Sequence, residues 1–583
     1  MMLRRVCVLC AFLVACGDDS TELDASSADA APPDAPGQDA PIDAGRDVPP
    51  ENMAPTAAFS VTSTDLEGGG VRISLDAGES TDADGTLESF RWTFSGDDEE
   101  SGEGMTLEHT FATPGCYVVT LEVSDDDGAT DMASADVLST SAAVDDESLV
   151  FETQPLVNAL LPRDVEANAG TATYTGTLST LGPARLVARV TSGEETVSET
   201  SLSLCETESK DFTLQVTIPS ELRTFDVALS VERGGASTDV GGTTNLVAGD
   251  VFIIQGQSNA ASGVYSPDGG ENDSPFVRTF GSRTDANPDA DQRWRGAAEA
   301  MGHMGQWPRR MAAQLSVAHD LPIALMNAAI GGQPIGFFER NDGDPSDPAT
   351  NYGRLFRRLR NAGLSESVRA ILWYQGESDA GDWETHRDGF VALYEDWLED
   401  YPSVERTYVT QLRLGCIGDL NRTQEVQRSL ADEYEAISVM STTALNAHDG
   451  CHYNYEEGYR ELGDRYVALV RRDIYGDVFD EDVDAPNPMS ARFNADRSEV
   501  TVQMRNADSV LSYEDGAEAD FLLEGSGVTF SGGRVEGSQL ILSVSAEASG
   551  ATALHYRGRA GAGQWVTNER GIGLLSFHGL SLE

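Results

Sequence analysis

The spacing of apolar residues changes at Gly249. This change excludes more folds than any other feature of the sequence. From this glycine to residue 477, short apolar runs such as VFIIQ, PIALMNAAI and RAILWYQ alternate with longer amphipathic segments. Strands that alternate with helices form a parallel sheet covered by helices on both faces. The sequence therefore predicts an α/β domain over residues 249–477, with functional groups at the carboxyl edge of its sheet.

The segments on either side of this domain have the period-two alternation of β-strands. Residues 55–140 and 141–248 contain runs such as VRISLDAGES and FDVALSVE, separated by turn residues. After an acidic linker, DVFDEDVDAPNP, residues 478–583 return to strands such as SEVTVQMRN and QLILSVS. Because 583 residues exceed what one hydrophobic core usually supports, we expect several domains: a β-sandwich, a β-rich accessory domain, the α/β domain and a C-terminal β-domain.

The first residues have the features of an export signal. Two arginines precede an apolar stretch over residues 6–15, which is too short to span a bilayer. The LVAC sequence that follows resembles a bacterial lipobox and implies removal of residues 1–15 and lipid attachment to Cys16; a plain signal peptide with a chance cysteine is the alternative. Residues 16–54 are rich in Asp, Ala and Pro and predict a disordered linker. We therefore expect an exported, membrane-anchored lipoprotein, on the cell surface or on the periplasmic face of the outer membrane.

Charge and cysteine content restrict the partners and the compartment. A formal net charge of −58 argues against nucleic-acid binding, since phosphates would be repelled by most of the surface. No later stretch has the length of apolar residues needed to cross a bilayer, so attachment is expected through the N-terminus alone. In an oxidising compartment Cys416 and Cys451 could form a disulfide, and two unpaired buried thiols are the alternative.

Three predicted strands of the α/β domain end in polar or glycine-rich sequence. The endings are GQSN at 256–259, GGQPI at 331–335 and QGESD at 375–379. A serine at the exit of a buried strand is accessible and held by the sheet, as a nucleophile must be. Ser258 is therefore a candidate nucleophile, although Ser and Asn also occur as simple helix caps.

A general base for this serine occurs near the end of the same domain. Asp449 stands three residues before His452, so one short loop can carry both side chains. The neutral imidazole can take the proton of Ser258, and the carboxylate can fix the tautomer and stabilise the imidazolium. A surface histidine is the alternative for His452, and it is the interpretation that we adopt for His448.

Acyl transfer also requires hydrogen-bond donors for the developing oxyanion. We expect them from the backbone N–H groups of Ser258 and Gly332 and from the side-chain amide of Gln375, since an ionised Glu377 cannot donate. Glu377 is assigned a supporting role, either orienting a neighbouring amide or contacting a sugar hydroxyl. Asn259 is expected in the same local network.

Four ordered blocks resemble the SGNH-hydrolase superfamily, and more closely the sialate O-acetylesterases and related carbohydrate acetylesterases. They are GQSN at 256–259, NAAIGG at 327–332, WYQGESD at 373–379 and DGCH at 449–452. The resemblance implies a three-layer flavodoxin-like domain and a serine esterase that removes acetyl groups from sugar hydroxyls through an acetyl-enzyme. It implies no metal and no organic cofactor. The superfamily often has asparagine in the third block, where this chain has QGE.

Two further resemblances concern the flanking domains. DADG at 82–85, FRW at 90–92 and TPGCYVVTL at 113–121 are similar to a PKD domain, an immunoglobulin-like module of secreted proteins. Calcium binding by the acidic turns is an alternative to plain turn chemistry, although DADG lacks the downstream glutamate of an EF-hand loop. The C-terminal sequence resembles the β-domain that closes some sialate O-acetylesterases. For this chain, a structural flank and a sugar-binding domain are the two alternatives.

These observations predict an exported serine esterase that acts on O-acetylated carbohydrate, either a glycan or sialic acid. A catalytically silent surface protein that only binds glycan is the alternative from another functional class. An esterase for a different acyl ester, of a lipid or of peptidoglycan, is the second alternative.

Overall fold

The computed structural model describes residues 52–583, except 67–68, 96–100, 141–147, 180–181, 206–209, 235, 264–269, 285, 300, 447 and 560. The predicted signal peptide, the lipidation site Cys16 and linker residues 16–51 lie outside the described residues.

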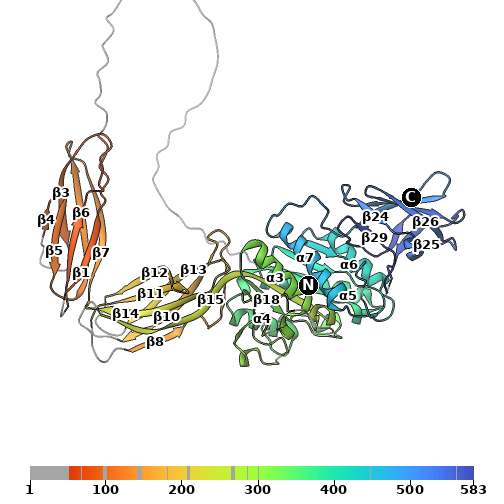
Figure 1. Ribbon diagram of the computed structural model, residues 1–583, viewed down its shortest axis with the longest axis horizontal. Helices are drawn as coiled ribbons and strands as arrows, with labels where there is room; N and C mark the ends of the chain where they lie inside the picture. The colour runs from red at the N-terminus through yellow and green to blue at the C-terminus, as the bar shows by residue number, and fades with distance from the viewer. Residues whose placement is uncertain are drawn as a thin grey trace, which may run out of the picture. The chain divides into compact units, whose positions relative to one another are not determined.

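The first folded region is an antiparallel β-sandwich with a core of its own, as predicted for residues 55–140 (Figure 1). Alternate side chains of its strands point inward, and Trp92 is fully buried at the centre. One sheet contains β1 (Ser60–Asp65), β2 (Val71–Asp76) and β5 (Thr106–Phe111). The other contains β4 (Ser101–Glu103), β3 (Leu87–Phe94), β6 (Gly115–Asp125) and β7 (Thr130–Ser139).

The second β-rich region is continuous with the α/β region. Its strands are β8 (Ser148–Thr153), β9 (Leu160–Pro162), β10 (Ala169–Ser179), β11 (Ala184–Ser192), β12 (Glu195–Leu204), β13 (Lys210–Pro219) and β14 (Phe225–Arg233). β15 (Ala236–Gly256) pairs antiparallel with β14 in its first half and parallel with two strands of the α/β sheet in its second half (Figure 1). The expected boundary at 248/249 therefore lies inside one strand, and a single hydrophobic core extends across it.

The sheet of the α/β region has the strand order β17-β16-β18-β15-β19-β20-β21. These strands are β16 (Val277–Phe280), β17 (Trp294–Gly296), β18 (Ile323–Asn327), β19 (Val368–Tyr374), β20 (Arg406–Thr410) and β21 (Ile437–Met440). All neighbouring strands are parallel except β16 and β17, which are antiparallel. The sheet is therefore mixed, whereas the sequence predicted a purely parallel one. The antiparallel strand arises because the chain turns back after β16 and adds a short strand at the edge.

Helices connect these strands. They are α1 (Ser258–Ala261), α2 (Met301–Met304), α3 (Gln306–His319), α4 (Asn351–Asn361), α5 (Trp383–Asp400), α6 (Asn421–Glu433) and α7 (Arg460–Asp473). α3 packs against α7 and α5 against α6. A π-helical turn over Tyr455–Tyr459 leads directly into α7, so the chain is helical from Tyr455 to Asp473. None of the helices in the described residues is long and apolar enough to span a membrane.

The C-terminal region is all β and has its own core, with additional contacts to the α/β region. Its strands are β22 (Pro488–Phe493), β23 (Glu499–Met504), β24 (Leu511–Tyr513), β25 (Phe521–Glu524), β26 (Phe530–Glu536), β27 (Gln539–Val544), β28 (Ala553–Tyr556), β29 (Val566–Asn568) and β30 (Phe577–Ser581). The side-chain amide of Gln411, just after β20, exchanges two 2.8 Å hydrogen bonds with the backbone of Ser576. This reciprocal pair joins the C-terminal region to the carboxyl edge of the α/β sheet.

Candidate active site

Ser258 stands at the first turn after β15, where the strands β15 and β19 approach closely. Gly256 has a φ of 130°, and a Cβ at this position would lie 2.1 Å from the carbonyl oxygen of Tyr374. Only glycine allows this approach, and the backbone N–H of Gln257 then donates to the same carbonyl at 2.9 Å. The sheet thereby fixes the backbone immediately before Ser258.

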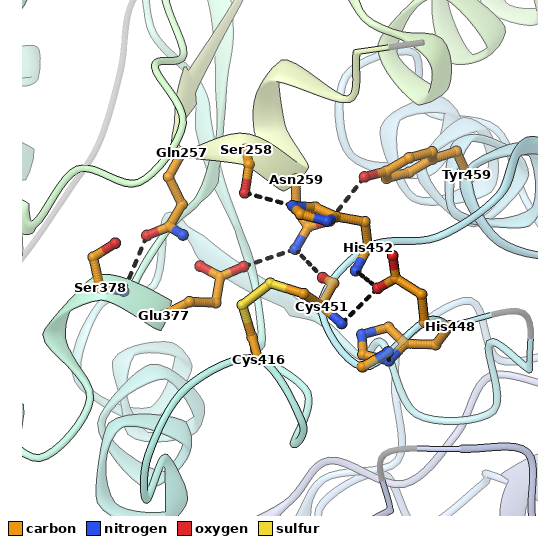
Figure 2. The surroundings of a disulfide bond; sticks show 12 residues. Gln257, Ser258, Asn259, Glu377, Ser378, Cys416, His448, Cys451, His452 and Tyr459 are labelled. Atoms are coloured by element: carbon orange, nitrogen blue, oxygen red, sulfur yellow. Dashed lines mark hydrogen bonds between the residues drawn. A yellow bond between two sulfur atoms is a disulfide. The ribbon is translucent and has the colours of Figure 1, made fainter. Parts of the chain in front are cut away.

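The hydroxyl of Ser258 and the imidazole of His452 are in contact. Ser258 Oγ lies 3.0 Å from His452 Nε2, although the two residues are 194 positions apart in the chain (Figure 2). This distance is within the range in which an imidazole can remove the hydroxyl proton.

Asp449 supports the backbone that carries this histidine. Its Oδ1 accepts hydrogen bonds from the backbone N–H of His452 at 2.7 Å and of Cys451 at 2.8 Å. The hydrogen bond from the backbone of His452 is the main reason that the pKa of Asp449 lies below its usual value, and the hydrogen bond from the backbone of Cys451 lowers it further. The carboxylate is therefore ionised at neutral pH, next to the site where an imidazolium would form.

A disulfide joins Cys416 to Cys451, beside His452 (Figure 2), which decides between the bonded and unbonded alternatives that the sequence left open. A second disulfide, Cys116–Cys205, was not predicted, because its two cysteines lie in regions that the sequence assigns to different domains. All cysteines within the described residues are thus bonded.

Asn259 connects three parts of the site. Its Nδ2 donates to Glu377 Oε1 at 2.7 Å and to the carbonyl oxygen of Cys451 at 3.0 Å. Its Oδ1 accepts from the hydroxyl of Tyr459 at 2.8 Å (Figure 2). The sequence predicted that Asn259 belongs to the hydrogen-bond network of the site. It did not predict Tyr459, because a tyrosine in an amphipathic helix is usually a core residue.

Glu377 is buried, with 2% of its surface exposed. Burial raises its pKa from the ordinary value of 4.5 to about 7, against the stabilising hydrogen bond from Asn259. This hydrogen bond is the contact with a neighbouring amide that the sequence suggested for Glu377. Its Oε2 is buried without a hydrogen-bond partner among the described residues.

The expected role of Gln375 as a third oxyanion donor requires correction. The residue is fully buried, and its Nε2 donates to Asp379 Oδ2 at 2.6 Å and to the carbonyl oxygen of Gln333 at 3.2 Å. Both amide hydrogens thus have acceptors away from Ser258. Asp379, to which the sequence assigned no role, also accepts the backbone N–H of Ile335 at 3.1 Å. Gln375 and Asp379 therefore hold the turn over residues 331–335.

This turn lies against Ser258. A Cβ built on Gly331 would lie 3.4 Å from the Cβ of Ser258, and Gly332 has a φ of 72° in the left-handed region. Within the described part of the chain, the backbone N–H groups of Ser258 and Gly332 have no backbone acceptor. Both are available as donors for an oxyanion, and the assignment of this role stays a prediction.

The described residues include no group of three or more histidine, cysteine, aspartate or glutamate side chains that could hold a metal ion. The aspartates of the DADG turn in the N-terminal sandwich, which are among the described residues, form no such group.

Comparison with known proteins shows which families this chain resembles. Residues 248–472 match the family model described as carbohydrate esterase, sialic acid-specific acetylesterase, and residues 52–139 match that of the PKD domain. The chain is therefore a multidomain esterase. The four blocks predicted the first match and the DADG region the second, and we refer to residues 52–139 as the PKD domain.

Several solved structures match parts of this chain. A carbohydrate acetylesterase from Xanthomonas citri is 19% identical, with a TM-score of 0.52, and the match covers 73% of this chain and 99% of that one. A protein from Arabidopsis thaliana is 21% identical over 39% of this chain and 98% of its own, with a TM-score of 0.31. The PKD1 domain of Epp from Vibrio anguillarum is 31% identical over 15% of this chain and 95% of its own, with a TM-score of 0.13. No curated protein matches the chain.

Proposed function

We propose that this protein is an exported serine esterase that removes O-acetyl groups from carbohydrate, either an acetylated glycan or sialic acid. The observation that carries the proposal is the 3.0 Å contact between Ser258 Oγ and His452 Nε2 at the carboxyl edge of the sheet. The family match of residues 248–472 supports the substrate class.

In the acylation step, His452 takes the proton of Ser258 while Oγ attacks the carbonyl carbon of the acetyl ester. The N–H groups of Ser258 and Gly332 stabilise the resulting oxyanion. Collapse of this intermediate breaks the bond to the sugar oxygen, which leaves with the proton from His452. Ser258 then carries the acetyl group.

In the deacylation step, His452 takes a proton from water, and the resulting hydroxide attacks the acetyl carbon. Collapse of the second intermediate releases acetic acid, which loses its proton to the solvent and becomes acetate, and His452 returns its proton to Ser258 Oγ. Asp449 acts throughout as an ionised carboxylate that holds the loop of His452 and stabilises the imidazolium.

The strand order supports the flavodoxin-like class for this domain. If β16 and β17 are set aside as an edge addition, the remaining order β18-β15-β19-β20-β21 is 2-1-3-4-5 in chain order. That order is typical of doubly wound flavodoxin-like sheets, in which ligands bind at the carboxyl ends of the strands.

Export and lipid attachment at Cys16 remain part of the proposal. The two disulfides, Cys116–Cys205 and Cys416–Cys451, support an oxidising compartment, because disulfides persist mainly in exported proteins.

The decisive experiment compares the wild-type protein with Ser258→Ala. We expect the wild type to hydrolyse p-nitrophenyl acetate and to release acetate from acetylated xylan or O-acetylated sialosides, and the variant to lose at least about 1000-fold in kcat. Release of fatty acid from triglycerides in preference to acetate would favour the esterase of another acyl ester. If the wild type binds glycan and hydrolyses none of these substrates, the protein is a silent binding protein and the proposal is wrong.

A further inference from the structure

The loop over residues 441–454, which we call the histidine loop, contacts the C-terminal β-domain. We infer that this domain positions His452 for catalysis, and that Arg413 and Trp565 are the positioning residues. The inference rests on the proposed function, and it assigns the C-terminal domain a task other than a structural flank or a sugar-binding module.

Arg413 links the histidine loop to the C-terminal domain. It follows β20, is 5% exposed, and donates from Nε to the carbonyl oxygen of Arg559 at 2.8 Å and from one terminal nitrogen to that of Gly561 at 2.6 Å. Its other terminal nitrogen donates to the carbonyl oxygen of Leu445 in the histidine loop. One guanidinium group thus holds two backbone segments together, because its planar donors point in fixed directions.

Trp565 makes a second link. Its ring, 3% exposed, lies with its centroid 5.2 Å from the guanidinium carbon of Arg413. Its indole N–H donates to the side chain of Asn446 in the histidine loop at 2.9 Å. Glu514 fixes the backbone of Trp565 with two hydrogen bonds of 3.0 Å, so the indole is held by the C-terminal domain.

The segment before α6 holds the other end of the loop. Cys416, three residues after Arg413, is bonded to Cys451, which precedes His452. The histidine loop is therefore attached on both sides of Asp449: at Leu445 and Asn446 by the C-terminal domain and Arg413, and at Cys451 by the disulfide.

Close packing supports the same conclusion. A Cβ on Gly573 of the C-terminal domain would lie 2.6 Å from the backbone of Thr443, so the two backbones are in direct contact. A displacement of about 1 Å of a catalytic group can lower a rate about 100-fold. The C-terminal contacts therefore control whether His452 Nε2 stays within reach of Ser258 Oγ.

The test uses the full chain and two mild variants. Trp565→Phe keeps an aromatic ring over Arg413 and removes the N–H, and Asn446→Ala removes the acceptor from a side chain that is exposed. For p-nitrophenyl acetate we expect each to lower kcat about 10-fold with KM unchanged within about twofold. The kcat of the double variant should equal that of either single variant, because both changes remove the same hydrogen bond.

Arg570→Gln is the matched control. Arg570 lies in the same part of the C-terminal domain, but its side chain pairs with Glu481 in the acidic linker at 3.0 Å. We expect this variant to keep wild-type kcat. Labelling of Ser258 by a fluorophosphonate provides a second readout, because it reports activation of the serine without acetate release, and it should slow in parallel with kcat.

Three results are distinguishable. If the two variants and their combination keep kcat within about twofold of wild type while Ser258→Ala is inactive, the C-terminal domain is only a flank and the inference is wrong. A loss of kcat in Arg570→Gln equal to that in Trp565→Phe would also overturn it, since the effect would then reflect general destabilisation. Wild-type activity in Ser258→Ala would instead refute the proposed function.

Discussion

At the residue scale, the site depends on buried polar side chains whose partners are other polar side chains. Asn259 is the clearest case, since its amide makes hydrogen bonds with Glu377 Oε1, with the hydroxyl of Tyr459 and with the backbone carbonyl of Cys451. A buried network of this kind is rigid when it is fully satisfied and costly when it is not. It fixes the first turn of α1, and with it Ser258.

Glu377 makes the stability of this network depend on pH. Its folded-state pKa of about 7 is above the ordinary value of 4.5. The folded protein therefore binds more protons than the unfolded chain between these values, and this residue's contribution to stability decreases as pH rises through the window and levels off above 7. Glu377→Gln keeps an oxygen for Asn259 and removes the charge.

We predict that the unfolding free energy of Glu377→Gln relative to wild type increases from pH 5 to pH 8, by up to about 3 kcal/mol. Urea denaturation at a series of pH values measures this difference. Glu366→Gln, at an exposed position, is the control for the removal of one negative charge. A difference that does not change with pH would contradict the prediction.

The arrangement of the site was only partly predictable from the sequence. That Ser258, His452 and Asp449 come together could be predicted, because their residue types at strand ends and in one short loop suggest a single chemistry. The role of Gln375 could not, because a sequence shows that an amide can donate but not which acceptor it meets. Here the acceptor is the carboxylate of Asp379, four residues later, so the amide of Gln375 is not free to donate to an oxyanion.

At the element scale, β15 and the histidine loop bring Ser258 Oγ and His452 Nε2 into contact. The periodicity of the α/β region predicted its strands and helices well, because each buried strand must be followed by a covering segment. It did not predict the antiparallel β17, since three residues at a sheet edge have no periodicity. The periodicity also did not predict that β15 is one continuous strand. The two halves of β15 pair with different strands and so differ in their pattern of buried residues, which suggested two separate segments.

The disulfide next to His452 leads to a prediction at this scale. It closes a loop of 35 residues, so replacing both Cys416 and Cys451 by serine should lower the unfolding free energy by about 3 kcal/mol. We expect kcat to fall as well, because one attachment of the histidine loop is lost. Thermal unfolding and hydrolysis of p-nitrophenyl acetate measure the two effects.

The other disulfide provides the control for this experiment. Serine at both Cys116 and Cys205 removes a cross-link that joins the PKD domain to the second β-rich region. We expect this pair of changes to leave kcat unaltered. Equal effects of the two pairs on kcat would show that the Cys416–Cys451 bond has no particular role at the site.

At the scale of the whole molecule, the described chain contains three hydrophobic cores rather than the four that the predicted domains imply. The PKD domain and the C-terminal domain each have one. The second β-rich region and the α/β region share the third, which includes Leu246 and Val251 on either side of the expected boundary. Composition could not reveal this, because a shared core leaves no linker in the sequence.

Two shortened chains test this division. A chain of residues 141–583 with Cys205→Ser should fold and keep kcat for p-nitrophenyl acetate within about twofold, because the PKD core is separate. A chain of residues 249–583 should fail to fold, since it lacks the residues between Ala159 and Ala248 that make up about a quarter of the shared core. Circular dichroism and gel filtration measure the outcome. A soluble, active 249–583 chain would contradict the assignment of one core.

The continuity of β15 also has a consequence for how such proteins can be recombined. A strand has a two-residue repeat, and this one is held in register by separate partners at each end. A junction inside it that adds or removes a single residue would invert the inner and outer faces of one half relative to the other. Chimaeras with related esterases should therefore exchange the second β-rich region and the hydrolytic region together, as one unit. Their N-terminal junction should lie upstream of residue 148.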